Sequence, residues 1–99
     1  MHACVLAVEI HIPSSTSLKA KRSVLRHLLD TARVRFRVAA SEVGFHDQWQ
    51  RSAIGFAAVG PDATQVEEIL DSVERFVWSH PEVEVVDASR HWIEVEAER

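Results

Sequence analysis

The sequence is poor in residues that several specialised folds require. It has one cysteine, three glycines and three prolines in 99 residues. A single cysteine, Cys4, excludes an internal disulfide and fits a reducing cytosol. Cys4 lies in an apolar run, so we interpret its thiol as a core side chain and not as a nucleophile. With no glycine-rich segment, the chain also lacks the signature of a phosphate-binding loop.

Long apolar segments are also missing. No window approaches the roughly 18 consecutive apolar residues of a membrane-spanning helix. The first residues lack the basic start and the apolar stretch of a signal peptide. We therefore expect a cytoplasmic protein without membrane contact. The length of 99 residues predicts one domain, residues 1–99.

Charge is distributed unevenly, although the formal net charge is only −4. Residues 1–55 carry eight Lys/Arg against four acidic residues, a net of +4. Residues 56–99 carry three Arg against eleven acidic residues, a net of −8. This division predicts one basic and one acidic face. They are either two solvated faces or a means of orienting a charged partner.

Hydrophobic periodicity predicts six elements. Apolar residues alternate in the strands and recur at spacings of three and four in the helices. A serine-rich turn ending at Ser17 supplies the cap of the first helix, and Asp62 or Thr64 caps the second. The predicted elements are strands at 3–12, 36–41, 49–59 and 82–95, and helices at 17–35 and from a cap at 62 or 64 to 79.

The order of these elements predicts the fold. Two split βαβ units favour an α+β, ferredoxin-like βαββαβ sandwich, in which a four-stranded antiparallel sheet carries two helices on one face. The first and third strands are apolar on both sides, so we expect them in the centre of the sheet. The adjacent pair Val85 and Val86 breaks the alternation of the last strand and predicts a β-bulge.

Two segments carry a family resemblance. "SLKAKRSVL" (17–25) opens the first helix, and "HDQWQRSAIG" (46–55) leads into the third strand. Together with "VEEIL" (66–70) and "PEVEVVD" (81–87), they resemble the YlxP-like family, small bacterial proteins grouped as a domain of unknown function. The resemblance implies a ferredoxin-like fold. Because members are often encoded beside translation and ribosome-maturation factors, it also implies an association with RNA or the ribosome, but no catalytic residues.

Known chemistries of this fold fit the sequence poorly. A standard RNA-recognition motif needs aromatic rings on its two central strands. Here Ile54 takes the basic position, Ala58 and Pro61 take two aromatic positions, and the first strand has no ring. The six histidines lack metal-ligand spacing, and no Ser/His/Asp arrangement stands out. We therefore predict no cofactor and no metal site, and we favour a non-catalytic protein over an enzyme.

The first helix predicts a basic docking surface for RNA or another anion. Its cations recur on one side, and Asp30 interrupts them. Contacts to phosphates give affinity without sequence readout, so we expect no DNA specificity. The candidate residues are Lys19, Lys21, Arg22, Arg26 and Arg33.

The third strand predicts a second surface. If the strand is regular from its start, Trp49 and Arg51 share the sheet face that the helices leave bare. Small residues continue that face, which is typical of an interface core between two copies of the chain. Alternatively, Trp49 only shields its own sheet edge. The candidate interface residues are Trp49, Arg51, Ala53, Ala57 and Val5.

The sequence thus predicts a non-catalytic binding module, an accessory protein of translation associated with RNA or the ribosome. The alternative is a small enzyme or an anion-binding regulatory domain that uses the segment 14–22. Helix amides and nearby cations favour an anion there, whereas helix capping alone also accounts for the serines. The two hypotheses differ in whether this segment forms a shaped pocket or only a cap.

Overall fold

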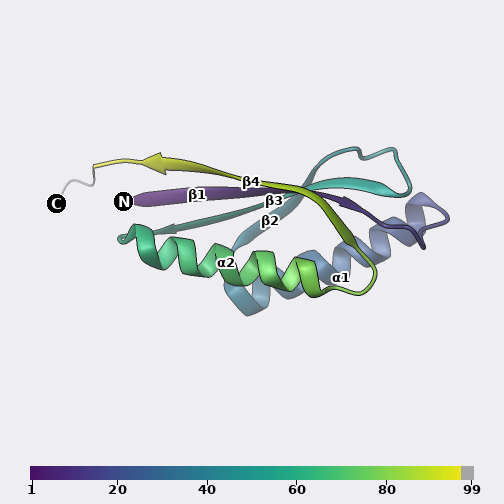
Figure 1. Ribbon diagram of the computed structural model, residues 1–99, viewed down its shortest axis with the longest axis horizontal. Coiled ribbons are helices and arrows are strands. Elements are labelled where there is room, and N and C mark those ends of the chain that lie inside the picture. The colour runs from purple at the N-terminus through teal and green to yellow at the C-terminus, as the bar shows by residue number, and fades with distance from the viewer. Residues whose placement is uncertain (97–99) are drawn as a thin grey trace.

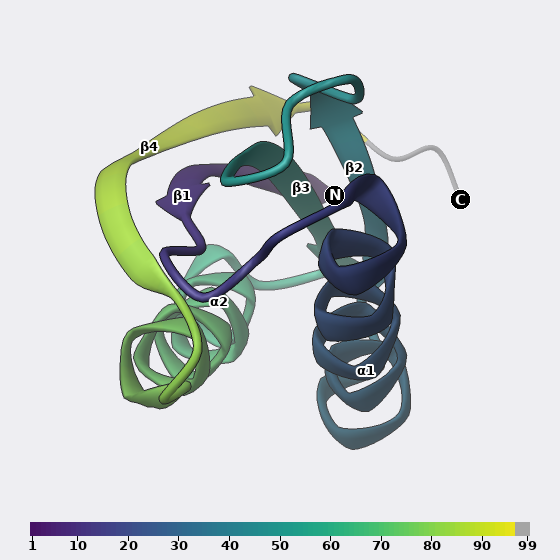
Figure 2. The ribbon, with the colours of Figure 1, turned by 90° about the vertical axis from the view of Figure 1, so that its right-hand side faces the viewer.

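The computed structural model describes residues 1–96, which fold as an α+β sandwich (Figure 1). The sheet order is β2-β3-β1-β4, and every neighbouring pair is antiparallel. Both helices cover the same face of the sheet (Figure 2). The predicted fold is therefore confirmed. The elements are β1 (His2–His11), α1 (Leu18–Phe36), β2 (Ala39–Gly44), β3 (Arg51–Gly60), α2 (Ala63–Ser79) and β4 (Glu84–Glu94).

The core lies between the sheet and the helices. β1 pairs with β3 over ten residues, and even-numbered side chains of both strands point toward the helices. Cys4 is buried among them, and this burial raises the pKa of its thiol, as a core cysteine requires. The principal core residues are Cys4, Leu6, Val8, Ile10, Ile54, Phe56, Leu25, Leu28, Val66, Leu70, Val73 and Val77.

The boundary between α1 and β2 lies later than predicted. The alternation of 36–41 predicted a strand, but the helix continues to Phe36 and the strand begins at Ala39. Arg37 ends the helix in the left-handed conformation (φ 56°), and its N–H donates to the carbonyl of Arg33. Phe36 packs on the Phe76 ring of α2 at 5.6 Å between centroids. This tertiary contact outweighs the local strand pattern.

The local signals at three other positions are confirmed. The Ser17 hydroxyl accepts the N–H of Ala20 at 3.0 Å, so Ser17 is the N-cap of α1. Asp62 caps α2 in the same way. In β4 the register shifts so that Glu9 faces Asp87 and Ile10 faces Val85, which leaves Val86 as the extra residue of a bulge. Within residues 1–96, no helix is long and apolar enough to cross a membrane.

Candidate functional site

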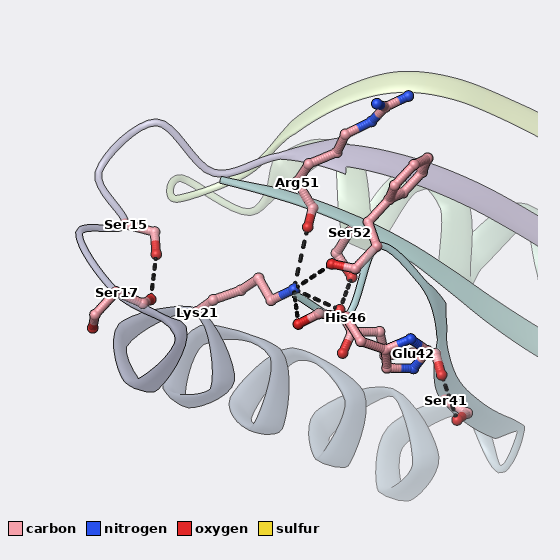
Figure 3. A network of polar contacts seen from close by, with 9 residues as sticks. Ser15, Ser17, Lys21, Ser41, Glu42, His46, Arg51 and Ser52 are labelled. Atoms are coloured by element: carbon pink, nitrogen blue, oxygen red, sulfur yellow. Dashed lines mark hydrogen bonds and ion pairs between the residues drawn. The ribbon is translucent and has the colours of Figure 1, made fainter. Parts of the chain in front are cut away.

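The buried ammonium group of Lys21 joins α1 to the loop between β2 and β3 (Figure 3). Lys21 is 1% exposed, and its Nζ lies 2.9 Å from Oε2 of Glu42. The same Nζ donates to the carbonyls of Phe45, His46 and Arg51 at 2.9, 3.3 and 3.3 Å. With its donors engaged inside the protein, Lys21 cannot also reach a phosphate. Its inclusion among the RNA- or anion-binding residues is therefore wrong.

The carboxylate of Glu42 completes this buried pair. Ser52 donates its hydroxyl to Oε2 of Glu42 at 2.7 Å. Burial alone raises the pKa of Glu42, but the hydrogen bonds from Ser52 and Lys21 and the charge of Lys21 outweigh it and hold the pKa below the ordinary value. Glu42 is therefore ionised at neutral pH, as an ion pair with Lys21 requires.

A signal for this pair was present in the sequence but was missed. Lys21 precedes Leu25 by four residues and Leu28 by seven, so it lies on the apolar stripe of α1. Its charge alone groups it with the neighbouring cations, whereas its position separates it from them. A lysine on a buried stripe requires a buried acid, and Glu42 occupies an inward-facing position of β2, opposite Ile54.

Gln50 fixes the other side of the same loop. Its Nε2 donates to the carbonyls of Pro13 and Ser15, each at 3.1 Å. The N–H of Ile12 donates to the carbonyl of Gln50 at 2.9 Å. The loop is thus attached to α1 through Lys21 and to the turn before α1 through Gln50.

These attachments place Trp49 outside the strand. The sequence predicted Trp49 as part of the third strand, but β3 begins at Arg51. Trp49 therefore lies in the loop before β3 and not on the strand, so the predicted strand start is wrong, and its place in an interface stays a prediction. Its side chain is 56% exposed and borders a surface hollow of about 530 Å³. The hollow is lined by His11, Asp47, Gln48, Trp49, Gln50 and Arg51.

The guanidinium of Arg51 is held at the start of β3, a central strand. It lies 3.7 Å from the centroid of the Phe45 ring, and its Nε donates to the carboxylate of Glu9 at 2.8 Å. The backbone carbonyl of Arg51 also accepts a hydrogen bond from Nζ of Lys21. Arg51 therefore has its own partners in the fold.

The other predicted interface residues lie on the open sheet face. Val5 pairs with Ala57, and Ala53 lies farther along β3 on the same side. Gly55 lies between them, where an added Cβ would touch Val43 of β2 at 3.5 Å. Val5 and Ala57 line a shallow apolar depression of about 260 Å³ together with residues of β2, whereas Ala53 lies on the same face outside it.

The remaining cations of α1 differ in how they are engaged. Arg33 donates to Asp30 at 2.6 Å and to the carbonyl of Ala40, so it covers part of the free edge of β2. In contrast, the exposed side chains of Lys19, Arg22 and Arg26 make no ion pair or side-chain hydrogen bond with residues 1–96. Three of the five predicted cations are therefore available to a partner.

The segment 14–22 has the geometry of a helix cap. Ser17 accepts the N–H of Ala20, and the buried Ser15 donates its hydroxyl to the carbonyl of Ser17. A hollow of about 500 Å³ lies beside these residues, but the carboxylate-bearing Glu82 contributes to its lining. A negative charge at that position disfavours an anion.

Comparison with known proteins identifies the family. Residues 3–90 match the family described as "Protein of unknown function (DUF503)". The chain belongs to this family. It is also similar to "Uncharacterized protein YlxP" of Bacillus subtilis (strain 168), with 39% identity over 84 residues, 85% of this chain and 91% of that protein. The family resemblance predicted from the sequence is thus confirmed.

In this DUF503 protein, the two segments that carried the resemblance are in contact. Lys21 belongs to the first segment, and the carbonyls of His46 and Arg51 that accept its hydrogen bonds belong to the second. The pair of motifs therefore describes one structural unit, a helix start that holds a loop with an exposed tryptophan.

Proposed function

We propose that this protein is a non-catalytic binding module that associates with RNA in translation and docks through α1. The observation that carries the proposal is the exposure of Lys19, Arg22 and Arg26, which have no ion-pair partner among residues 1–96. The family resemblance independently implied an association with RNA or the ribosome.

The spacing of the three cations suits a phosphate backbone. Steps of three and four residues put them on one stripe of the helix. From Lys19 to Arg26 the helix rises about 10 Å, an axial length over which one strand of a duplex carries about three phosphates. Binding of this kind is sequence-independent and weakens steeply with salt.

Acidic side chains of α2 and β4 support the same orientation. α2 exposes Glu67 and Glu68, and β4 begins with the exposed Glu84. Glu82, in contrast, lines a hollow with Ala20 and Ser23 of α1. Because α1 lies beside β2 and α2 lies toward β4 (Figure 2), the helix that carries Glu67 and Glu68 is on the other side of the helical layer from α1. A polyanion is repelled from the acidic side and directed to α1.

The test measures the affinity for a labelled ribosomal RNA fragment by fluorescence anisotropy at several salt concentrations. We expect Arg22→Glu with Arg26→Glu to abolish binding at low salt. Neutral replacement by Gln should reduce the salt slope by about 1 to 2, because two phosphate contacts are lost. An unchanged circular dichroism spectrum shows that the fold is retained.

A matched control makes the same change in net charge elsewhere. Arg35→Glu with Arg75→Glu alters two exposed arginines that border the groove between the helices. This variant should keep most of its RNA affinity. If both double variants lose the RNA equally, or if both retain it, the stripe on α1 is only a solvated face.

We also propose that a second copy of the chain covers the open sheet face. Val5, Ala53 and Ala57 form its apolar centre, and small side chains let two sheets approach closely. Strand geometry gives roughly 600 Å² of flat face, close to the roughly 800 Å² that each partner contributes to a standard interface. Light scattering at high micromolar concentration should report a dimer, and Ala57→Glu should make it a monomer. A native monomer at that concentration contradicts the proposal.

A further inference from the structure

We propose that Trp49 is a base-stacking residue, which holds an unpaired nucleobase of the RNA that docks on α1. This inference rests on the proposed function and adds the class of RNA, single-stranded rather than duplex. The site is the hollow of about 530 Å³ beside Trp49, which is within the size range of small-ligand sites.

The side chain of Trp49 is not part of the hydrophobic core. Its side chain is 56% exposed, although a tryptophan is among the residues that gain most from burial. An exposed indole offers a flat surface on which any base stacks, whatever its identity.

The loop that carries Trp49 is held in one arrangement before any partner binds. Lys21 bonds to carbonyls on both sides of Trp49, those of His46 and Arg51. Gln50, the next residue, is attached to Pro13 and Ser15. A partner that stacks on a fixed ring loses less conformational entropy at the site than one that must order a flexible loop.

The attachment to Lys21 also joins the loop to the helix that carries the cations. Lys21 lies between Lys19 and Arg22 in the first turns of α1, and its Nζ reaches the loop (Figure 3). Lys19 and Arg22 are exposed in the same turns. Because successive residues of a helix are turned by about 100°, Lys19 and Arg22 point away from Lys21. A flexible single strand whose phosphates contact these cations therefore reaches Trp49 with a base several nucleotides along.

The polar residues of the hollow suit the edge of a base better than a phosphate. The side chains of Asp47 and Gln48 are exposed and make no hydrogen bond with residues 1–96. An amide can donate to and accept from a base edge, and a carboxylate accepts from an exocyclic amino group. The negative charge of Asp47 keeps phosphates on the α1 side, and Arg51 is already engaged by Glu9.

The experiment compares two RNA probes by fluorescence anisotropy at low salt. One is single-stranded hexaadenylate, and the other is a blunt RNA duplex with a similar number of phosphates. We expect Trp49→Ala to weaken hexaadenylate binding roughly ten- to a hundredfold and to leave duplex binding unchanged, because stacking acts only on unpaired bases. Trp49→Phe should restore most of the affinity, because phenylalanine also stacks.

Trp78→Ala is the matched control, since Trp78 is 60% exposed on α2, away from the basic stripe. It should leave both affinities unchanged. In a protein with Trp78→Phe and Trp92→Phe, Trp49 is the only remaining tryptophan, and hexaadenylate should quench its fluorescence at saturation.

The outcomes separate this inference from the proposed function. If Arg22→Glu with Arg26→Glu abolishes binding of both probes while Trp49→Ala changes neither, α1 binds RNA but the stacking site is wrong. If the wild-type protein binds neither probe, both proposals are wrong. If Trp49→Ala removes a co-purifying protein and leaves RNA affinity intact, the loop is a protein contact and the inference is also overturned.

Discussion

Two ionic clusters each fasten a helix of this protein to an edge strand, but they differ in burial. Lys21 of α1 meets Glu42 of β2 with side chains 1% and 18% exposed. Arg90 of β4 meets Asp71 and Glu74 of α2, with the arginine side chain 23% exposed and both acids more so. Both clusters pair a cationic side chain with carboxylates, but water reaches the cluster around Arg90 more easily than the one around Lys21.

The difference determines what each cluster does. Around Lys21 the low dielectric makes an unpaired charge costly, so the whole loop that supplies its acceptors is held in place. Around Arg90, water screens the ions and replaces a lost partner at small cost. A buried ion pair here specifies a local conformation, and an exposed one adds a small increment of stability.

The largest effect should come from removing the buried cation. Lys21→Ala leaves the Glu42 carboxylate with Ser52 as its remaining partner, and we expect the free energy of unfolding to fall by about 3–5 kcal/mol. Urea unfolding monitored by circular dichroism measures this value. Amide hydrogen exchange should accelerate at 45–51 even where the rest of the sheet stays protected.

The control for this variant removes both charges. Lys21→Met with Glu42→Leu leaves no unpaired ion, so stability should recover to within about 1–2 kcal/mol of the wild type. Exchange in the loop should stay fast, because the carbonyls of Phe45 and Arg51 have still lost their donor. A loop that remains protected in the double variant contradicts the role assigned to Lys21.

The second effect is a dependence of stability on pH. The folded-state pKa of Glu42 is lower than its ordinary value of 4.5, so its ionisation stabilises the fold above that pH. This contribution is lost as the pH falls from about 5 through the folded-state pKa. Thermal unfolding between pH 6 and pH 3 should show a steeper loss for the wild type than for Glu42→Gln. Parallel curves would mean that Glu42 does not titrate differently in the folded state.

A smaller effect is expected at the exposed cluster. Arg90→Ala removes the contacts to Asp71 and Glu74 at 2.8 and 3.0 Å. We expect a loss of about 1 kcal/mol or less, and a smaller one in high salt. Urea unfolding at low and high salt measures both. A loss as large as that of Lys21→Ala would remove the distinction between the clusters.

The smallest effect should come from Arg37, which lies between α1 and β2 and belongs to neither ionic cluster. A change there tests whether the loop responds only to the buried cluster. Arg37 adopts a left-handed conformation (φ 56°) that glycine tolerates better. Arg37→Gly should raise the free energy of unfolding by about 0.5 kcal/mol, as urea unfolding would show. Exchange in the loop at 45–51 should not change. A stability loss would indicate that the Arg37 side chain has a role beyond ending the helix.

The sequence alone determined the fold, because its signals are local. Alternation over 3–12 and the helical spacing of Leu25 and Leu28 were sufficient to predict the topology. The caps at Ser17 and Asp62 and the bulge at Val86 also depend on neighbours in the chain, and all three are present. The same local signals marked Lys19, Arg22 and Arg26 as exposed cations on one stripe.

The tertiary structure decided what depends on residues far apart in the chain. The apolar stripe of α1 marks Lys21 as buried, but only the tertiary structure identifies its partner, Glu42, 21 positions away. Trp49 lies outside β3 because the neighbouring Gln50 donates hydrogen bonds to carbonyls more than 30 positions earlier in the chain. Phe36 stayed helical because Phe76 packs on it. Periodicity reports which side of an element is apolar, but the partner of a buried charge and the path of a loop depend on long-range contacts that no local pattern contains.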